Sequence, residues 1–220
     1  MSTMRRIAQP RAVGGIAEKV KELVDHLPRS ARVLDAACGE GYLSEELSIA
    51  GFADFTCVDL DVSGFKLDRS KFKFVVADLN GPLPFPDGSF DIIIGSETIE
   101  HLENPSAYLR ELNRILAVNG VIILTTPNVS TLSARIRFLL TGNPEWFRLD
   151  NYLIDGHITV LPEVVLERLI QAAGLRVETK TYNVGYLPII SRNPKFRLRK
   201  KLLTPLFGWI CVYRLMRSGA

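Results

Sequence analysis

The sequence has little cysteine, little net charge and no long apolar run. Its three cysteines, Cys38, Cys57 and Cys211, are an odd number and stand far apart in 220 residues. This excludes the dense disulfide framework of small secreted domains and predicts reduced thiols in a cytoplasmic protein. A net charge of +3 is too small to indicate nucleic-acid binding, so no nucleic-acid partner is expected.

Nothing in the sequence is typical of a leader or a membrane span. The N-terminal M-S-T-M-R-R-I-A-Q-P-R lacks the apolar core of a signal peptide. The apolar run at 202–216 is shorter than the roughly 20 residues that a spanning helix needs, and it contains Pro205 and Arg214. With 47% hydrophobic and 23% charged residues, the chain is expected to form one globular domain over 1–220.

The most informative stretch is V-L-D-A-A-C-G-E-G-Y-L-S at 33–44. A short apolar run precedes its glycines, and apolar residues at helical spacing follow them, so Gly39 and Gly41 are expected on a strand-to-helix turn. Glycine permits backbone angles that let the chain approach a ligand closely, and the following helix directs unpaired N–H groups into the same space. The stretch therefore predicts a nucleotide-cofactor turn.

The residues around this turn indicate the kind of ligand. Leu43 and Ser44 stand where a dinucleotide fold has its third glycine, and Asp35 offers a carboxylate, so a cationic ligand fits better than a pyrophosphate. A second apolar run, 55–58, ends at Asp59, 24 residues after Asp35. An acid at this offset is typical of ribose binding; the alternative is a carboxylate that only closes a strand-end turn.

Strands and helices are expected to alternate along the rest of the chain. Alternation of this kind predicts a parallel α/β sheet. A truncated helix is expected at 61–70, and a turn at Asn119 and Gly120 is expected to lead into the fifth strand. Further strands are expected at 72–77, 90–95, 121–126, 176–182 and 209–215, and helices at 13–27, 105–116 and 162–173.

Segment 33–44 resembles motif I of the class I S-adenosylmethionine-dependent methyltransferases, whose later motifs follow in order through residue 177. Ala37 stands where that family usually has glycine. The resemblance implies a Rossmann-like, mostly parallel seven-stranded sheet of order 3-2-1-4-5-7-6 with helices on both faces, and S-adenosyl-L-methionine as the cofactor. It places Asp59 on the ribose, Leu60 against adenine and Asp78 near the adenine amino group. The cofactor-binding residues that it implies are Asp35, Ala36, Cys38, Gly39, Gly41, Asp59, Leu60, Asp78, Leu79 and Ser96.

The sequence S-E-T-I-E-H at 96–101 follows the fourth expected strand. A helical turn there would place Glu97, Glu100 and His101 on one face. The motif resembles the E-x-x-E-H of ubiquinone-biosynthesis and small-RNA 2′-O-methyltransferases, which is linked to a divalent metal, and His157 resembles a later histidine of the latter. The resemblance implies that Glu97, Glu100, His101 and His157 hold magnesium or manganese, with His101, His157 and Glu97 catalytic. Two alternatives remain: the histidines act directly as base, or the acids only favour a helix start and His101 packs beside the cofactor.

Two further segments carry expectations about partners. The stretch at 129–160 is expected to form a lid over the substrate, or else an ordinary insertion that packs its aromatic residues on the domain. The stretch at 192–201 is expected to be a solvated basic face or a peripheral contact with an anionic membrane at its inner face. Its six basic residues are Arg192, Lys195, Arg197, Arg199, Lys200 and Lys201.

The leading function from sequence is methyl transfer to a hydroxyl group of a small-molecule, lipid-linked or glycan substrate. Transfer to nitrogen or to an RNA ribose 2′-hydroxyl is the alternative among enzymes. A non-catalytic, cofactor-binding partner subunit is the alternative of another class, because a fold by itself does not establish turnover.

Overall fold

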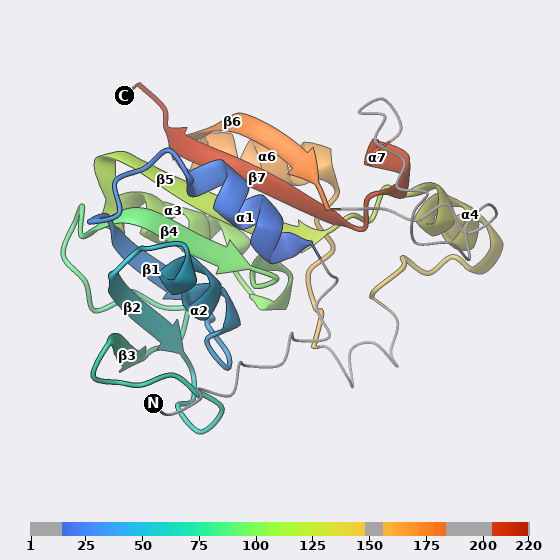
Figure 1. The fold of residues 1–220 in the computed structure, drawn as a ribbon. Coiled ribbons are helices and arrows are strands. Elements are labelled where there is room, and N and C mark those ends of the chain that lie inside the picture. The colour runs from blue at the N-terminus through green and yellow to red at the C-terminus, as the bar shows by residue number, and fades with distance from the viewer. Residues whose placement is uncertain (1–14, 148–155, 184–203, 220) are drawn as a thin grey trace.

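The computed structural model describes residues 15–147, 156–183 and 204–219 (Figure 1). Seven strands form one sheet in the order β3-β2-β1-β4-β5-β7-β6. The first five strands run parallel, and β7 is antiparallel to both β5 and β6. The predicted sheet and its order are confirmed. The strands are β1 (Arg32–Ala36), β2 (Asp54–Asp59), β3 (Phe72–Val76), β4 (Phe90–Ser96), β5 (Leu116–Pro127), β6 (Leu175–Tyr182) and β7 (Ile210–Arg217).

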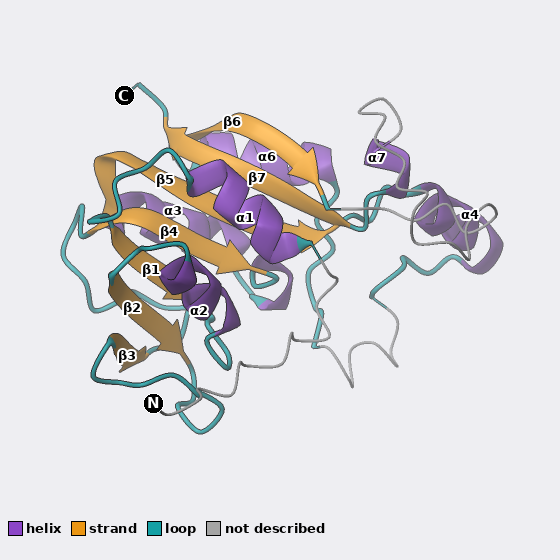
Figure 2. Ribbon diagram, in the orientation of Figure 1, coloured by secondary structure: helices purple, strands orange, loops and turns teal. Residues whose placement is uncertain are grey.

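Helices cover both faces of the sheet, as predicted (Figure 2). On one face α1 and α2 pack, and on the other α3 and α6. A short 3-10 turn, η1, follows β4. The helices and this turn are α1 (Ile16–Val24), α2 (Tyr42–Ile49), η1 (Ile99–His101), α3 (Pro105–Ile115), α4 (Leu132–Thr141), α6 (Glu163–Ala172) and α7 (Thr204–Phe207).

Alternating side chains of the central strands supply two separate apolar cores. In β1, Val33 belongs to the core under α1 and α2, whereas Leu34 belongs to the core under α3 and α6. In β4, Ile92 and Ile93 divide in the same way. Strands buried on both faces need apolar residues at every position, which explains why their sequences are almost continuously hydrophobic.

The fifth strand corrects one expectation. The turn predicted at Asn119 and Gly120 is wrong, because β5 runs without a break from Leu116 to Pro127. Phe90 pairs with Leu116, and the register then shifts so that Ile92 pairs with Val121. The register pairs none of residues 117–120 with β4, so these residues form an irregularity within the strand opposite Asp91. The truncated helix expected at 61–70 is not present, because the structure has only turns, bends and irregular backbone there.

Several expectations concern segments that the structure describes in part or not at all. The basic segment at 192–201 and residues 148–155 of the expected lid lie outside the described residues. Cys38, Cys57 and Cys211 are free thiols, as expected. Within the described ranges, each helix is too short or too polar to pass through a lipid bilayer.

Candidate active site

The carboxyl ends of β1, β2 and β4 meet at one edge of the sheet, where open α/β proteins bind ligands. The turn after β1 is tied to the end of β2. The N–H groups of Ala37 and Cys38 donate to the Val58 carbonyl at 2.8 and 3.0 Å, and the Gly39 N–H donates to Asp59 Oδ2 at 2.8 Å. The two features that sequence singled out, a glycine turn and an acid 20 residues after Gly39, are thus in direct contact.

Small residues occupy three positions of this turn for different structural reasons: Gly41, Gly39 and Ala37. Gly41 caps α2 with φ +95°, and a Cβ there would lie 2.7 Å from Leu67. Gly39 has φ +52° and open space where a Cβ would be, so its backbone faces room for a ligand. Ala37 adopts φ +65° in spite of its side chain, at a cost of about 1–2 kcal/mol. Strain at this position is consistent with a ligand-binding turn.

Asp35 is enclosed at the end of β1 and is only 2% exposed. Its Oδ2 accepts a hydrogen bond of 2.7 Å from Ser44 Oγ, which lies 3.3 Å from the thiol of Cys57. Burial raises the pKa of Asp35 to about 6, although the hydrogen bonds from Ser44 oppose this shift. The carboxylate therefore costs stability at neutral pH unless a cation comes near it.

Replacing Asp35 with asparagine is expected to change the pH dependence of stability. The folded chain holds the Asp35 proton more tightly than the unfolded chain does, so wild-type stability falls as pH rises from about 4 to about 6, by up to about 3 kcal/mol. D35N lacks this proton, and Asn Oδ1 can still accept from Ser44. Urea unfolding of both proteins at about pH 4 and pH 7 measures the difference between their slopes. If stability changes equally with pH in the wild type and in D35N, the raised pKa of Asp35 is contradicted.

A cavity of about 290 Å³ opens beside the turn, at the small end of the roughly 300–1,000 Å³ typical of small-molecule sites. It joins residues predicted to contact cofactor with residues predicted to be catalytic. Six of the ten predicted cofactor residues do not line it. Asp35 and Ala36 are buried in β1, and Ser96 ends β4 with its Oγ 3.1 Å from Thr125 Oγ1. The other three, Cys38, Gly39 and Gly41, belong to the turn. The lining residues are Ala37, Asp59, Leu60, Asp78, Leu79, Asn80, Glu97, Thr98, His101 and Leu102.

Asn80 is a lining residue that sequence reasoning missed. Its N–H and Nδ2 donate to Asp78 Oδ1 at 2.9 and 3.1 Å, and its Oδ1 accepts from the Glu103 N–H at 2.9 Å. Asn80 therefore connects the loop after β3 to the segment after η1 across the cavity. The only signal in the sequence is its position two residues after Asp78, where an asparagine is equally typical of a turn.

The E-x-x-E-H motif does not form one continuous helical turn. Glu97 has φ +50° and stands before the 3-10 turn, and its Oε1 accepts from Thr125 Oγ1 at 2.8 Å. Glu100 is fully buried, and its Oε2 accepts from Thr126 Oγ1 at 3.0 Å. Among the described residues, Glu100 Oε1 has no hydrogen-bond partner. A buried carboxylate oxygen without a donor is suited to a cation or to a proton of its own.

His157 lies against this motif although it follows His101 by 56 positions. The backbone N–H groups of Ile158 and Thr159 both donate to the Glu100 carbonyl, at 3.0 and 2.9 Å. Thr159 Oγ1 also donates to the Leu102 carbonyl at 2.8 Å. These bonds hold the His157 ring edge-on to the His101 ring, with 4.8 Å between the ring centroids.

Three side chains converge where η1 contacts residues 157–159. Glu100, His101 and His157 each offer one possible ligand atom, and these atoms lie within 4.8 Å of one another. Glu97, expected in the same group, is not part of it; its carboxylate is bound to Thr125. The structure thus assembles three of the four residues expected to hold a metal.

A backbone carbonyl fixes the tautomer of His157. The Nδ1 atom lies 3.0 Å from the Trp146 carbonyl oxygen, which can only accept, so Nδ1 carries the proton and Nε2 is left with a lone pair. Trp146 has φ +72°, an uncommon conformation that directs its carbonyl toward the ring. An imidazole oriented in this way is suited to act as a metal ligand or as a base.

The fold and the sequence now identify the family. A family model described as a methyltransferase domain matches residues 5–180. The chain belongs to the class I S-adenosylmethionine-dependent methyltransferases. The expectation drawn from motif I is thereby confirmed.

Individual relatives agree with this methyltransferase family. A probable S-adenosylmethionine-dependent methyltransferase of Mycobacterium tuberculosis is 35% identical over 103 residues, which cover 46% of this chain and 37% of that protein. A ubiquinone biosynthesis O-methyltransferase of Xanthomonas oryzae pv. oryzae is 33% identical over 105 residues, 44% of each chain. The chain thus spans less than half the length of either relative. A solved methyltransferase of Mesorhizobium loti shares the fold with a TM-score of 0.67 over 92% of this chain and 99% of its own, at 18% identity.

The two acids of the methyltransferase motif influence each other. Burial and then the neighbouring charge of Glu97 raise the pKa of Glu100 well above its usual value, and enclosure raises the pKa of Glu97 against the hydrogen bond from Thr125. Burial thus favours a proton on Glu100. A cation bound beside Glu100 would displace that proton, so cation affinity would rise with pH.

Proposed function

We propose that this methyltransferase transfers a methyl group from S-adenosylmethionine to a hydroxyl oxygen of a small-molecule, lipid-linked or glycan acceptor. The observation that carries the proposal is the position of His101, which lines the cavity and also belongs to the cluster with Glu100 and His157. A proton-accepting group is thus adjacent to the space for the cofactor. The similarity to a ubiquinone biosynthesis O-methyltransferase gives further support.

The cofactor side of the cavity is suited to a nucleoside. Asp59 presents a carboxylate to the cavity, and Leu60 and Leu79 offer apolar contact. Asp78 lines the same wall and is oriented by its two bonds from Asn80. S-adenosylmethionine bound there would supply the activated methyl group. The work of the protein is to hold the acceptor in line with the methyl carbon and to exclude water.

Transfer to oxygen also requires the removal of one proton. The acceptor oxygen forms a bond to the methyl carbon, the carbon–sulfur bond breaks to leave a neutral thioether, and the hydroxyl proton passes to a base. His157 Nε2 has the lone pair for this step because the Trp146 carbonyl holds the proton of Nδ1. Positioned histidine bases typically contribute about 10²–10⁴-fold to rate.

The same cluster fits a divalent cation. Glu100 Oε1 is buried without a partner among the described residues, and His101 and His157 would complete the ligand set. Two imidazoles and one carboxylate suit manganese or a later transition ion better than magnesium, which prefers oxygen ligands. A cation held there would supply Lewis acidity that makes the acceptor hydroxyl more acidic.

Incubation of the protein with methyl-labelled S-adenosylmethionine and a panel of phenols, aliphatic alcohols, glycans and lipid-linked hydroxyl compounds tests this function. The expected product is a labelled methyl ether, identified by mass spectrometry. Activity abolished by chelation and restored by manganese supports the metal, whereas activity that survives exhaustive chelation supports a direct histidine base. Labelled N-methyl or RNA 2′-O-methyl products would overturn the proposed acceptor class, and cofactor binding without any turnover would favour a partner subunit.

A further inference from the structure

Helix α4 exposes apolar side chains that a helix of a globular domain normally buries. Of its ten residues only Ala134 is buried. Four large apolar residues of one face are exposed instead: Leu132 at 42%, Ile136 at 50%, Leu139 at 83% and Leu140 at 77%; on another face, Phe138 is 55% exposed. Apolar patches of this kind on a protein surface mark interaction sites.

These four residues, Leu132, Ile136, Leu139 and Leu140, form an apolar stripe. Their spacing of i, i+4, i+7 and i+8 places them on one face of the helix, and the rotation of about 100° per residue places Ala134 on the opposite face. The helix is therefore amphipathic with its apolar stripe turned away from the protein. Within the ranges 15–147, 156–183 and 204–219, no packing against the domain accounts for the stripe.

Basic side chains lie on both sides of the stripe, and on one side the Glu145 carboxylate lines the same hollow as Arg137. Helical rotation places Arg135 at one edge and Arg137 at the other, and α4 itself contains no acidic residue. Arg135 is exposed and uses its Nε to bond the Ser130 carbonyl at 3.0 Å, which leaves its terminal nitrogens for other partners. Long basic side chains beside an apolar face are typical of helices that lie in a membrane interface.

The helix is held firmly at its base and extends beyond the sheet beside α7 (Figure 1). Thr131 caps it by accepting from the Ala134 N–H at 3.1 Å. Asn128 Nδ2 donates to the carbonyls of Pro205 and Gly208 at 2.9 and 2.8 Å, which ties the start of this segment to α7. Because β5 leads directly into α4, the stripe is presented from the sheet edge that carries the cofactor cavity.

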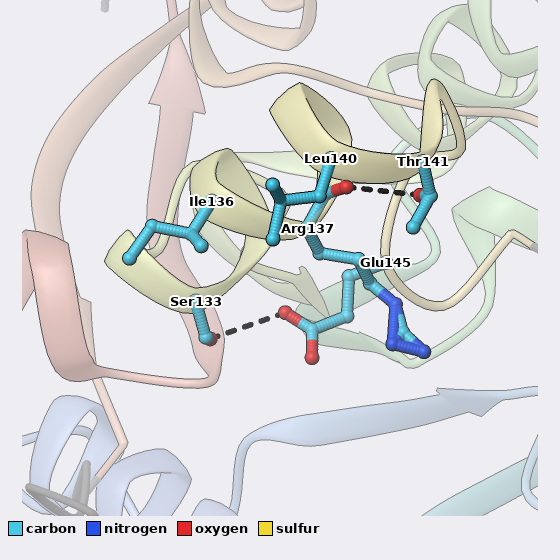
Figure 3. A pocket seen from close by; sticks show the side chains of 6 residues that line it. All are labelled: Ser133, Ile136, Arg137, Leu140, Thr141 and Glu145. Atoms are coloured by element: carbon cyan, nitrogen blue, oxygen red, sulfur yellow. Dashed lines mark hydrogen bonds between the residues drawn. The ribbon is translucent and has the colours of Figure 1, made fainter.

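One edge of the stripe opens into a hollow of about 420 Å³ (Figure 3). Ser133 Oγ donates to Glu145 Oε2 at 3.2 Å across it, and Thr141 Oγ1 donates to the Arg137 carbonyl at 2.9 Å. The surface of α4 is therefore grooved beside its apolar stripe. The residues lining the groove are Ser133, Ile136, Arg137, Leu140, Thr141 and Glu145.

We propose that the stripe of α4 docks on an anionic lipid bilayer, with the four apolar side chains among the acyl chains and with Arg135 and Arg137 at the lipid phosphates. A helix of ten residues is about 15 Å long, too short to cross a bilayer and suited to lie in its surface. Pairing of two copies through the stripe would bring four arginines together with no acid on either helix. Anionic lipid satisfies the apolar stripe and the charges together.

Flotation of the full chain with vesicles of phosphatidylcholine, with or without phosphatidylglycerol, tests the docking without any methyl acceptor. The variant L139Q/L140Q is expected to lower the partition coefficient at least about 10-fold, because two leucines no longer enter the bilayer. R135Q/R137Q is expected to lower binding to phosphatidylglycerol vesicles by roughly 5-fold per arginine. The matched control is I49Q/V118Q, which changes two residues that are 63% and 70% exposed on α2 and β5.

If the stripe contacts something other than lipid, the experiments give different results. Failure of the wild type to float with anionic vesicles, or equal flotation of L139Q/L140Q, overturns docking by α4. A concentration-dependent dimer in light scattering that L139Q/L140Q abolishes assigns the stripe to a second copy instead. A larger loss of Tm for L139Q/L140Q than for I49Q/V118Q shows that the chain itself covers the stripe. Because flotation needs neither cofactor nor turnover, failure of the proposed methyl transfer would leave these results unchanged.

Discussion

Replacing His157 with alanine is expected to lower kcat about 100- to 10,000-fold, while the Kd for S-adenosylmethionine changes little. The variant removes the Nε2 lone pair that the Trp146 carbonyl makes available, whether it serves a base or a ligand. His157 does not line the cavity predicted for the cofactor, so cofactor affinity is expected to persist. Single-turnover kinetics and calorimetry measure the two quantities separately.

His26 provides the matched control for H157A. His26 is exposed and is the one histidine of the chain's three that does not belong to the cluster. Its Nε2 lies 3.0 Å from Arg214, and the residue is far in sequence from the E-x-x-E-H motif. H26A is expected to keep kcat. Recovery of H157A activity by added imidazole would favour a base, whereas recovery only with higher manganese would favour a ligand. If H157A retains full turnover, His157 serves neither as base nor as metal ligand, and His101 becomes the remaining histidine of the cluster.

The strands could be predicted from the sequence because apolar runs are signals within single segments, whereas the strand order was implied by the resemblance to the methyltransferase family. Apolar runs that end in acids define β1 and β2, and the resemblance at Gly39 and Gly41 supplied the antiparallel β7. The irregularity in β5 was not predictable in the same way. It depends on which residue of β4 lies opposite Leu116, and this pairing is a property of the assembled sheet.

The candidate site shows the same division. The motif at Glu97, Glu100 and His101 is contiguous and could be identified, but the left-handed backbone at Glu97, which separates it from the cluster, could not. The Trp146 carbonyl that orients His157 leaves no signal, because every residue has a carbonyl. Contacts made by backbone atoms across long sequence separations require the folded chain.

Helix α4 illustrates a further limit. The segment at 129–160 was expected to be a lid or a packed insertion, and no helix was expected at 132–141. An amphipathic helix of a globular domain normally packs its apolar face on that domain. The structure places Ala134 inward and Leu139 outward, the reverse of that rule. A periodic pattern shows which residues share one face of a helix. The way in which the helix is attached to the domain determines what that face contacts.

Replacing Asp59 with alanine is expected to weaken S-adenosylmethionine binding by about 1–3 kcal/mol, or roughly 5- to 150-fold in Kd. Asp59 Oδ1 accepts from the Leu60 N–H and Oδ2 from the Gly39 N–H, both at 2.8 Å, so the carboxylate is fixed at the cavity wall. Each oxygen retains capacity for a further donor, such as a ribose hydroxyl. Calorimetric titration of both proteins with the cofactor measures the loss.

Two effects of D59A must be separated, because the variant removes both a ligand contact and an anchor of the glycine turn. The matched control D61A removes a nearby acid that accepts local hydrogen bonds from Ser63 and does not line the cavity, and it is expected to bind as the wild type. Titration with adenosine and with adenine then tests the ribose contact itself. If Asp59 binds ribose, D59A loses the preference for adenosine over adenine; if it only anchors Gly39, both fragments weaken equally and their ratio is kept. An unchanged cofactor Kd in D59A would remove Asp59 from the binding site altogether.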